Sequence, residues 1–170
     1  EEFLIKVDKG AIVLDVRSPA EFLDGHIKGA ISWPLFSNEE RARIGTLYKQ
    51  RSREEAVDLG LELIGPRMKK LAQYGRELFE SQSSSDGSRV RTELLIHCWR
   101  GGMRSESIAW LLRTAGIPSI VLEGGYKAFR SYARTQFDRD IDFAVLGGLT
   151  GSAKTETLIE ISKLPGESVI

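Results

Sequence analysis

Short apolar runs alternate along this chain with longer segments in which apolar residues recur every three or four positions. The runs Ala11–Leu14, Ile31–Trp33, Glu93–His97 and Ser119–Leu122 have the length and composition of short buried strands. The segments between them are typical of amphipathic helices. Strands that alternate with helices at this spacing predict parallel β-α-β units, and so an α/β domain over residues 1–138.

Capping residues and helix breakers mark the ends of the predicted helices. A first helix opens at Ser18, with Pro19 in its first turn and Glu21 three residues after the cap. Residues 38–80 are predicted to form a helical insert of three helices, with caps at Asn38 and Ser52 and a break at Gly65-Pro66. Further predicted features are a polar loop over 81–88, a helix over 104–115 and a helix that ends near residue 137.

Composition narrows the class of protein. The 170 residues are 41% hydrophobic and carry 24 basic and 24 acidic side chains, so we expect one well-packed domain plus the start of another. The single cysteine rules out an intrachain disulfide and a cysteine-based zinc site, and we expect no metal. The sequence contains no signal peptide and no long apolar run. We therefore expect a cytoplasmic protein that does not contact a membrane.

A local basic cluster lies within the predicted insert, although the net charge of the chain is zero. Zero net charge argues against nucleic-acid binding through bulk electrostatics. The cluster is either a solvated helix face or a contact for a polyanion, and its members are Arg41, Arg43, Lys49, Arg51 and Arg53.

Cys98 stands where a predicted strand turns into a predicted helix. A thiol at a helix N-terminus, close to cations, can have a pKa of about 3.5–7.5 instead of roughly 8.5. Arg100 and Arg104 are such cations, and Gly101 and Gly102 allow successive amides to face inward. The pattern predicts a nucleophile in an anion-binding loop. The alternative for a lone cysteine after an apolar run is an inert buried residue.

Other residues near this loop have predicted roles, and for Trp99 two alternatives remain. Met103 completes the loop and is grouped with its anion-binding positions, whereas Trp99 either stacks on a substrate or packs in the core. We expect Asp15 and Arg17 to form a structural pair behind the loop. His97 points away from Cys98 along the strand, which predicts a hydrogen-bonded core histidine.

The last thirty residues contain a second motif. A predicted strand over 142–146 precedes a stretch that nearly matches the phosphate-binding P-loop, with Gly148, Gly151, Lys154 and Thr155 as its candidate ligands. Ala153 replaces the second glycine of the pattern, which costs about 1–2 kcal/mol if that position is left-handed. With a helix from Lys154 to near residue 163, residues 139–170 are expected to be the incomplete start of a P-loop domain.

Several of these segments resemble a known family. Residues 15–22, 25–30 and 122–128 and the Cys98 loop resemble a rhodanese domain. The octapeptide 98–105, the insert sequences 34–41 and 45–50, and the order of a rhodanese domain before a P-loop are similar to the bacterial tRNA 2-selenouridine synthase family.

This resemblance implies a tRNA-modifying transferase. It would replace the 2-thio sulfur of a wobble 2-thiouridine by selenium from selenophosphate, through an S-geranylated intermediate made with geranyl diphosphate. Cys98 would be the essential residue of the selenation half, and residues 148–155 the phosphate-binding loop of the other half. The implied partners are tRNA and the two phosphorylated co-substrates, with no firmly bound cofactor.

Other functions remain open at this stage. Cys98 and Arg104 have the spacing of cysteine-dependent phosphatases, for which Asp86 or Glu123 would have to act as the general acid. A generic rhodanese-type sulfurtransferase and a non-catalytic binding module fit the same loop.

Overall fold

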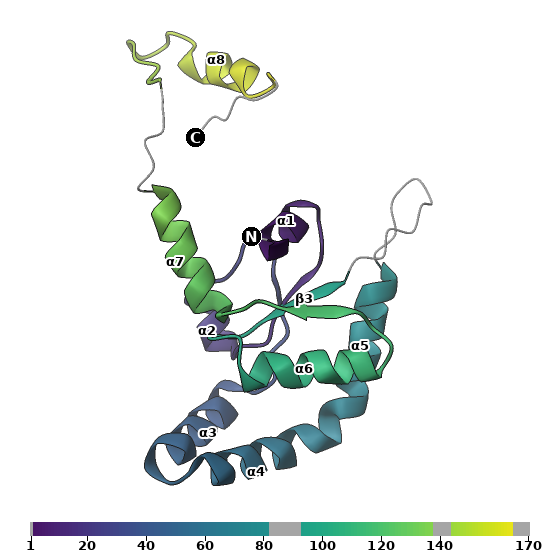
Figure 1. Cartoon of the computed structure of the whole chain (residues 1–170). Coiled ribbons are helices and arrows are strands. Elements are labelled where there is room, and N and C mark those ends of the chain that lie inside the picture. The colour runs from purple at the N-terminus through teal and green to yellow at the C-terminus, as the bar shows by residue number, and fades with distance from the viewer. Residues whose placement is uncertain (1, 82–92, 138–143, 165–170) are drawn as a thin grey trace. The chain divides into compact units, whose positions relative to one another are not determined.

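The structure is a computed structural model that describes residues 2–81, 93–137 and 144–164. The chain divides into two compact units, residues 1–137 and 138–170. The first unit contains a parallel sheet in the order β2-β1-β3-β4, built from Val13–Asp15 (β1), Ile31–Ser32 (β2), Leu94–His97 (β3) and Ser119–Val121 (β4) (Figure 1). The predicted α/β class and all four strands of this unit are confirmed.

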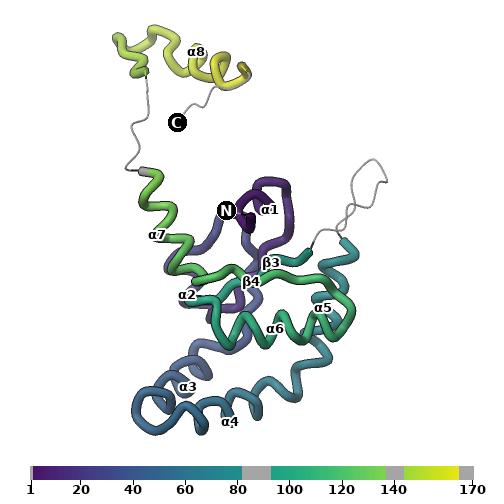
Figure 2. The backbone as a smooth tube through the Cα atoms, in the orientation of Figure 1, coloured from purple at the N-terminus to yellow at the C-terminus, as the bar shows by residue number. Residues whose placement is uncertain are grey.

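Alternation along the strands divides the core into two apolar clusters, one on each face of the sheet. Leu14, Leu94 and Ile96 pack on one face with side chains of α5 (Met68–Ser81) and α6 (Met103–Thr114). Val13 and Leu95 face the other way and pack with side chains of α1 (Glu2–Asp8) and α7 (Gly125–Phe137). Figure 2 shows these helices on opposite sides of the sheet. Because both faces are covered, most strand residues are apolar, and the polar ones lie at the strand ends.

The helices confirm the predicted three-helix insert and add one that was not predicted. The insert consists of α3, α4, a 3-10 turn η1 and α5. The unexpected helix is α1, whose Phe3 and Val7 pack into the core one turn apart. The bounds are Glu2–Asp8 (α1), Pro19–Leu23 (α2), Asn38–Gln50 (α3), Arg53–Ile64 (α4), Gly65–Arg67 (η1), Met68–Ser81 (α5), Met103–Thr114 (α6), Gly125–Phe137 (α7) and Lys154–Ile161 (α8). Beyond Ser81, the predicted 81–88 loop lies outside the described residues.

The helix caps agree with the prediction at α2 and α4 and differ at α3. Ser18 and Glu21 form the reciprocal capping box of α2. The cap of α3 is Ser37, not Asn38, because the Asn38 side chain instead accepts the backbone N–H of Ala20 at 2.9 Å. Ser52 caps α4 by accepting the N–H of Glu55.

In the second unit the predicted helix forms and the predicted strand does not. Residues 144–149 have no regular secondary structure, and residues 142 and 143 lie outside the described part. The described part of this unit offers residues 144–146 no second strand with which to pair. Ala153 has φ 54° and ψ 26° before α8, so the left-handed conformation considered above is present.

Candidate active site

Cys98 lies directly after the central strand β3, in a loop that ends where α6 begins at Met103. The first turn of α7 holds this loop, because the backbone N–H groups of Tyr126 and Lys127 donate to the carbonyls of Cys98 and Trp99 at 2.9 and 3.0 Å. Only 3% of Cys98 is exposed. The loop is therefore joined to two elements, and the thiol lies at its base.

Close backbone packing explains one of the two loop glycines. Gly101 has φ 67°, and a Cβ there would lie 2.5 Å from the carbonyl oxygen of Leu122. Gly125 approaches from the opposite side with φ 59°, and its Cβ would lie 2.5 Å from the Gly101 nitrogen. Gly102 has φ −104° and open space around it. The close approach of the two turns thus requires Gly101 and Gly125.

The thiol sits among hydrogen-bond donors. Its Sγ lies 3.2 Å from the hydroxyl of Ser105, and the backbone N–H groups of Arg100 and Ser105 also point to it. Burial raises the pKa of Cys98, but these hydrogen bonds and the charge of Arg104 outweigh it, so the pKa is lowered overall. Ser105, wholly buried in the first turn of α6, was not singled out from the sequence. Its place in the first turn of a helix that follows the cysteine was the available signal.

Arg104 is held by a carboxylate. Its guanidinium forms a two-pronged ion pair with Glu21, with N–O distances of 2.7 and 3.2 Å, which joins α6 to the cap of α2. Burial raises the pKa of Glu21, but hydrogen bonds from Arg104 and from the backbone of Ser18 outweigh this effect, so the pKa is lowered overall. Arg104 therefore acts on the thiol through its positive charge, while two nitrogens of its guanidinium are bonded to Glu21. Arg100 is exposed and forms no ion pair with any described residue.

The two apolar residues of the loop face different surroundings. Trp99 packs against the second core cluster, with its ring centre 5.8 Å from that of Tyr126. Met103 is half exposed, and its sulfur accepts a hydrogen bond of 3.6 Å from the Arg53 guanidinium of the insert. Trp99 is thus placed as a packing residue, and Met103 marks where the insert meets the loop.

A buried polar group supports the loop from behind. Asp15 and Arg17 form an ion pair of 2.6 Å with almost no exposure, as expected for a structural pair, and the guanidinium lies 3.9 Å from the ring centre of Tyr126. His97 is buried as predicted, but neither ring nitrogen has a hydrogen bond of ordinary geometry among the described residues. Its Nε2 lies 3.6 Å from Asp15. Burial lowers the pKa of His97, and the Asp15 charge offsets this only in part, so the ring is neutral near pH 7.

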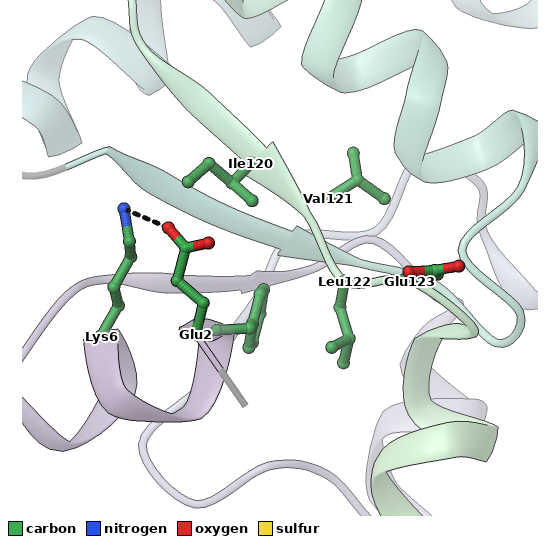
Figure 3. Close-up of a pocket in the computed structure, with 7 residues that line it drawn as sticks. Glu2, Lys6, Ile120, Val121, Leu122 and Glu123 are labelled. Carbon is green, nitrogen blue, oxygen red and sulfur yellow. Dashed lines mark ion pairs between the residues drawn. The ribbon is translucent and has the colours of Figure 1, made fainter.

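A separate hollow of about 390 Å³ lies between α1 and the end of β4 (Figure 3). Glu2 and Glu123 contribute acidic groups to its lining, and the ammonium of Lys6 is already paired with Glu2 and Glu93. These charges disfavour the binding of phosphate in this hollow. Glu123, one of the candidate general acids, lines this hollow, and Asp86 lies outside the described residues.

The candidate phosphate ligands of the second unit form a loop of their own. Gly148 and Gly151 have φ 149° and 83°, and Thr155 is exposed in the first turn of α8. The Lys154 ammonium donates to the carbonyls of Gly148 and Leu149 at 3.0 and 2.7 Å. The lysine therefore bonds to its own loop, and a phosphate would have to replace these carbonyls.

Among the described residues, no three His, Cys, Asp or Glu side chains lie together as a group that could hold a metal ion. None of the helices in this part of the chain is long and apolar enough to cross a membrane.

A parallel sheet that carries a cysteine loop at the end of its central strand defines the class of protein. The rhodanese-like domain family matches residues 1–132, and the chain belongs to this family.

More specific similarity comes from individual proteins. The chain is 36% identical over 149 residues to the tRNA 2-selenouridine synthase of Pseudomonas fluorescens Pf-5, and 37% identical over 155 residues to that of Bordetella petrii. These matches cover 86% and 88% of the chain but 39% of each relative, so the chain spans about two fifths of their length. Among solved structures, the N-terminal domain of a candidate ATP/GTP-binding protein from Clostridium difficile 630 matches with a TM-score of 0.63 and 36% identity, over 72% of this chain and 88% of that one.

Proposed function

We propose that this chain is the rhodanese part, with the start of the P-loop part, of a tRNA 2-selenouridine synthase. The observation that carries the proposal is a sulfur held in a cradle of N–H and O–H donors, in a chain similar to enzymes of that name. A cradle that favours an anionic sulfur also favours the anionic selenium or phosphate of selenophosphate.

The proposed reaction balances in two steps. In the first, the 2-thio sulfur of a wobble 2-thiouridine attacks C1 of geranyl diphosphate, so a C–S bond forms, a C–O bond breaks and diphosphate leaves. In the second, the Cys98 thiolate attacks the phosphorus of selenophosphate, so an S–P bond forms, the Se–P bond breaks and selenide leaves. The selenide forms a bond to C2 of the base, the C–S bond breaks and geranyl thiolate leaves, and water then cleaves the S–P bond to release phosphate and restore the thiolate. Arg100 with the loop amides holds the phosphate.

We assign the diphosphate of the first step to the loop of the second unit. Gly148, Gly151, Lys154 and Thr155 are its ligands in this proposal. The support is the left-handed turn that places Lys154 at the start of α8, where an ammonium and free N–H groups lie together. Both phosphorylated compounds are substrates in this scheme, so no resident cofactor is required.

The ion pair of the Arg104 guanidinium with Glu21 distinguishes this proposal from phosphatase chemistry. A cysteine-dependent phosphatase needs the guanidinium to face the phosphate, and here it faces Glu21. The exposed Arg100 is the arginine that holds the phosphate of the selenium donor in this proposal.

Replacing the nucleophile tests the proposed function. The complete encoded protein is given thiolated tRNA, geranyl diphosphate and selenophosphate, and selenated nucleoside is measured by mass spectrometry. We expect Cys98→Ser to lower its formation by about 100-fold or more, because a serine hydroxyl is not ionised near neutral pH. Ser107→Ala, which removes an exposed hydroxyl from α6, is the control and should retain activity.

Each other outcome points to a different function. Selenation that survives Cys98→Ser contradicts the assignment of the thiolate. Sulfur transfer without any use of selenophosphate favours a generic sulfurtransferase, and rapid hydrolysis of an aryl phosphate favours a phosphatase.

A further inference from the structure

We propose that the first turns of α3 and α4 form a binding surface for the phosphate backbone of the tRNA, with Arg41 and Arg53 as its phosphate contacts. This inference rests on the proposed function, because it names the place where that substrate is held. It gives the helical insert a role beside the Cys98 loop.

Two contacts place this surface beside the Cys98 loop. Arg53, the first residue of α4, reaches the sulfur of Met103 at the start of α6, at 3.6 Å. Arg41 of α3 lies 3.7 Å from the Glu21 carboxylate that holds Arg104. The insert therefore meets the residues that follow Cys98, and it does so through guanidinium groups.

Arg41 is built into this position. A Cβ at Gly45, one turn along α3, would lie 2.6 Å from Nη1 of Arg41, so the missing side chain leaves room for the guanidinium. The Arg41 Nε is buried and has no hydrogen-bond partner among the described residues, whereas the side chain as a whole is 39% exposed. The guanidinium is therefore held at the surface, where its other N–H groups can donate to a phosphate oxygen.

The positive and negative charges next to the Cys98 loop do not cancel. Four guanidinium groups stand against the one carboxylate of Glu21, and they belong to Arg41, Arg53, Arg100 and Arg104. Such an excess attracts a polyanion more strongly than a single phosphate, because each neutralised phosphate releases a counterion.

Other acidic residues nearby make other contacts. Glu39 accepts the Ser37 hydroxyl, Glu40 pairs with Arg67, and Glu106 lies 4.0 Å from Arg113. Residues advance by 100° along a helix, so Glu54 and Glu55 leave α4 in other directions than Arg53. Arg43 interacts with Glu40, so the basic cluster seen in the sequence divides, and only part of it reaches the loop.

The test measures how salt weakens tRNA binding to the complete encoded protein. We expect Arg53→Gln to raise the Kd for thiolated tRNA about 3- to 10-fold near 0.1 M salt and to lower the slope of log Kd against log salt by about one. Arg53→Lys should keep most of the slope, since the charge stays. Arg76→Gln is the matched control, because Arg76 follows Gly75, which packs on Leu112 near the opposite end of α6 from Met103.

The outcomes separate this surface from the reaction itself. An unchanged slope in Arg53→Gln overturns the inference, as does a raised KM for selenophosphate with tRNA binding intact, because the groups would then serve the small substrate. If the wild-type protein fails to selenate tRNA but the slope changes as expected, the surface is supported and the proposed reaction is overturned. If the wild type selenates tRNA and Arg53→Gln matches Arg76→Gln in binding, only the surface is overturned.

Discussion

The Ser105 hydroxyl lies between two acceptors, the Cys98 sulfur at 3.2 Å and the Gly102 carbonyl at 3.0 Å. A hydroxyl has one proton, so it can donate to only one of them at a time. Beside a neutral thiol it donates to Gly102 and accepts from the S–H group. Beside a thiolate, donation to sulfur is the stronger bond. Ser105 thus favours the ionised form of Cys98.

Removing that hydroxyl should make the thiol ionise at higher pH. A hydrogen bond to a charged group contributes about 1.5–3 kcal/mol, so Ser105→Ala should move the midpoint of thiol reactivity upward by about one to two pH units. The sign follows from the lowered pKa of Cys98, because losing a donor raises it again. The rate of iodoacetamide alkylation against pH gives the midpoint. Ser107→Ala should leave the profile unchanged, and an unchanged profile in Ser105→Ala would refute the role.

At the scale of elements, the Cys98 loop is held between β3, α6 and α7. Backbone hydrogen bonds join it to α7, and the ion pair of Arg104 with Glu21 joins α6 to α2. The loop geometry therefore depends on contacts between segments that lie far apart in the chain. The glycines at the contact are the positions most sensitive to substitution.

Substituting the two neighbouring loop glycines should give unequal losses of unfolding free energy. Gly101→Ala combines a left-handed conformation, about 1–2 kcal/mol, with a clash against Leu122, so we expect at least 2 kcal/mol of lost unfolding free energy. Gly102→Ala meets open space at a negative φ and should cost less than about 1 kcal/mol. Urea unfolding of both variants provides the comparison. Equal losses would show that the contact with the 122–125 turn does not determine the loop.

At the scale of the whole molecule, the chain consists of two compact units. Both apolar clusters are made of residues from the first unit, between Phe3 and Phe129. The P-loop-like residues belong to the second unit, residues 138–170. Stability and anion binding by this second loop should therefore be separable.

A chain that ends at Phe137 should keep its fold and lose diphosphate binding. We expect its thermal midpoint to stay within about 2 °C of that of residues 1–170, because the core is complete. Residues 1–170 should bind pyrophosphate only weakly, with a Kd of about 1 mM, because Lys154 must leave its own carbonyls. Circular dichroism and calorimetry measure the two quantities. A fallen midpoint, or equal pyrophosphate binding by both chains, would contradict the division.

Local patterns predicted the strands and most helices of the first unit because capping, apolar periodicity and breakers act over a few residues. The Ser18 cap and the insert with its break at Gly65 were readable in this way. The strand expected over 142–146 did not form in its described residues, because a strand needs a partner that local sequence does not specify. Helix α1 was missed because its seven residues gain stability from Phe3 and Val7 in the core.

The sequence by itself determined the fold class, the cysteine at a strand-to-helix turn and the candidate loop around it, because these depend on residue type and short spacing. Only the tertiary structure decided which groups act on the cysteine. Ser105 faces the sulfur, Arg104 is held by Glu21, and Arg53 reaches Met103 from the insert. These contacts join residues up to 83 positions apart, and packing of the folded chain sets the distances on which hydrogen bonds and charges depend.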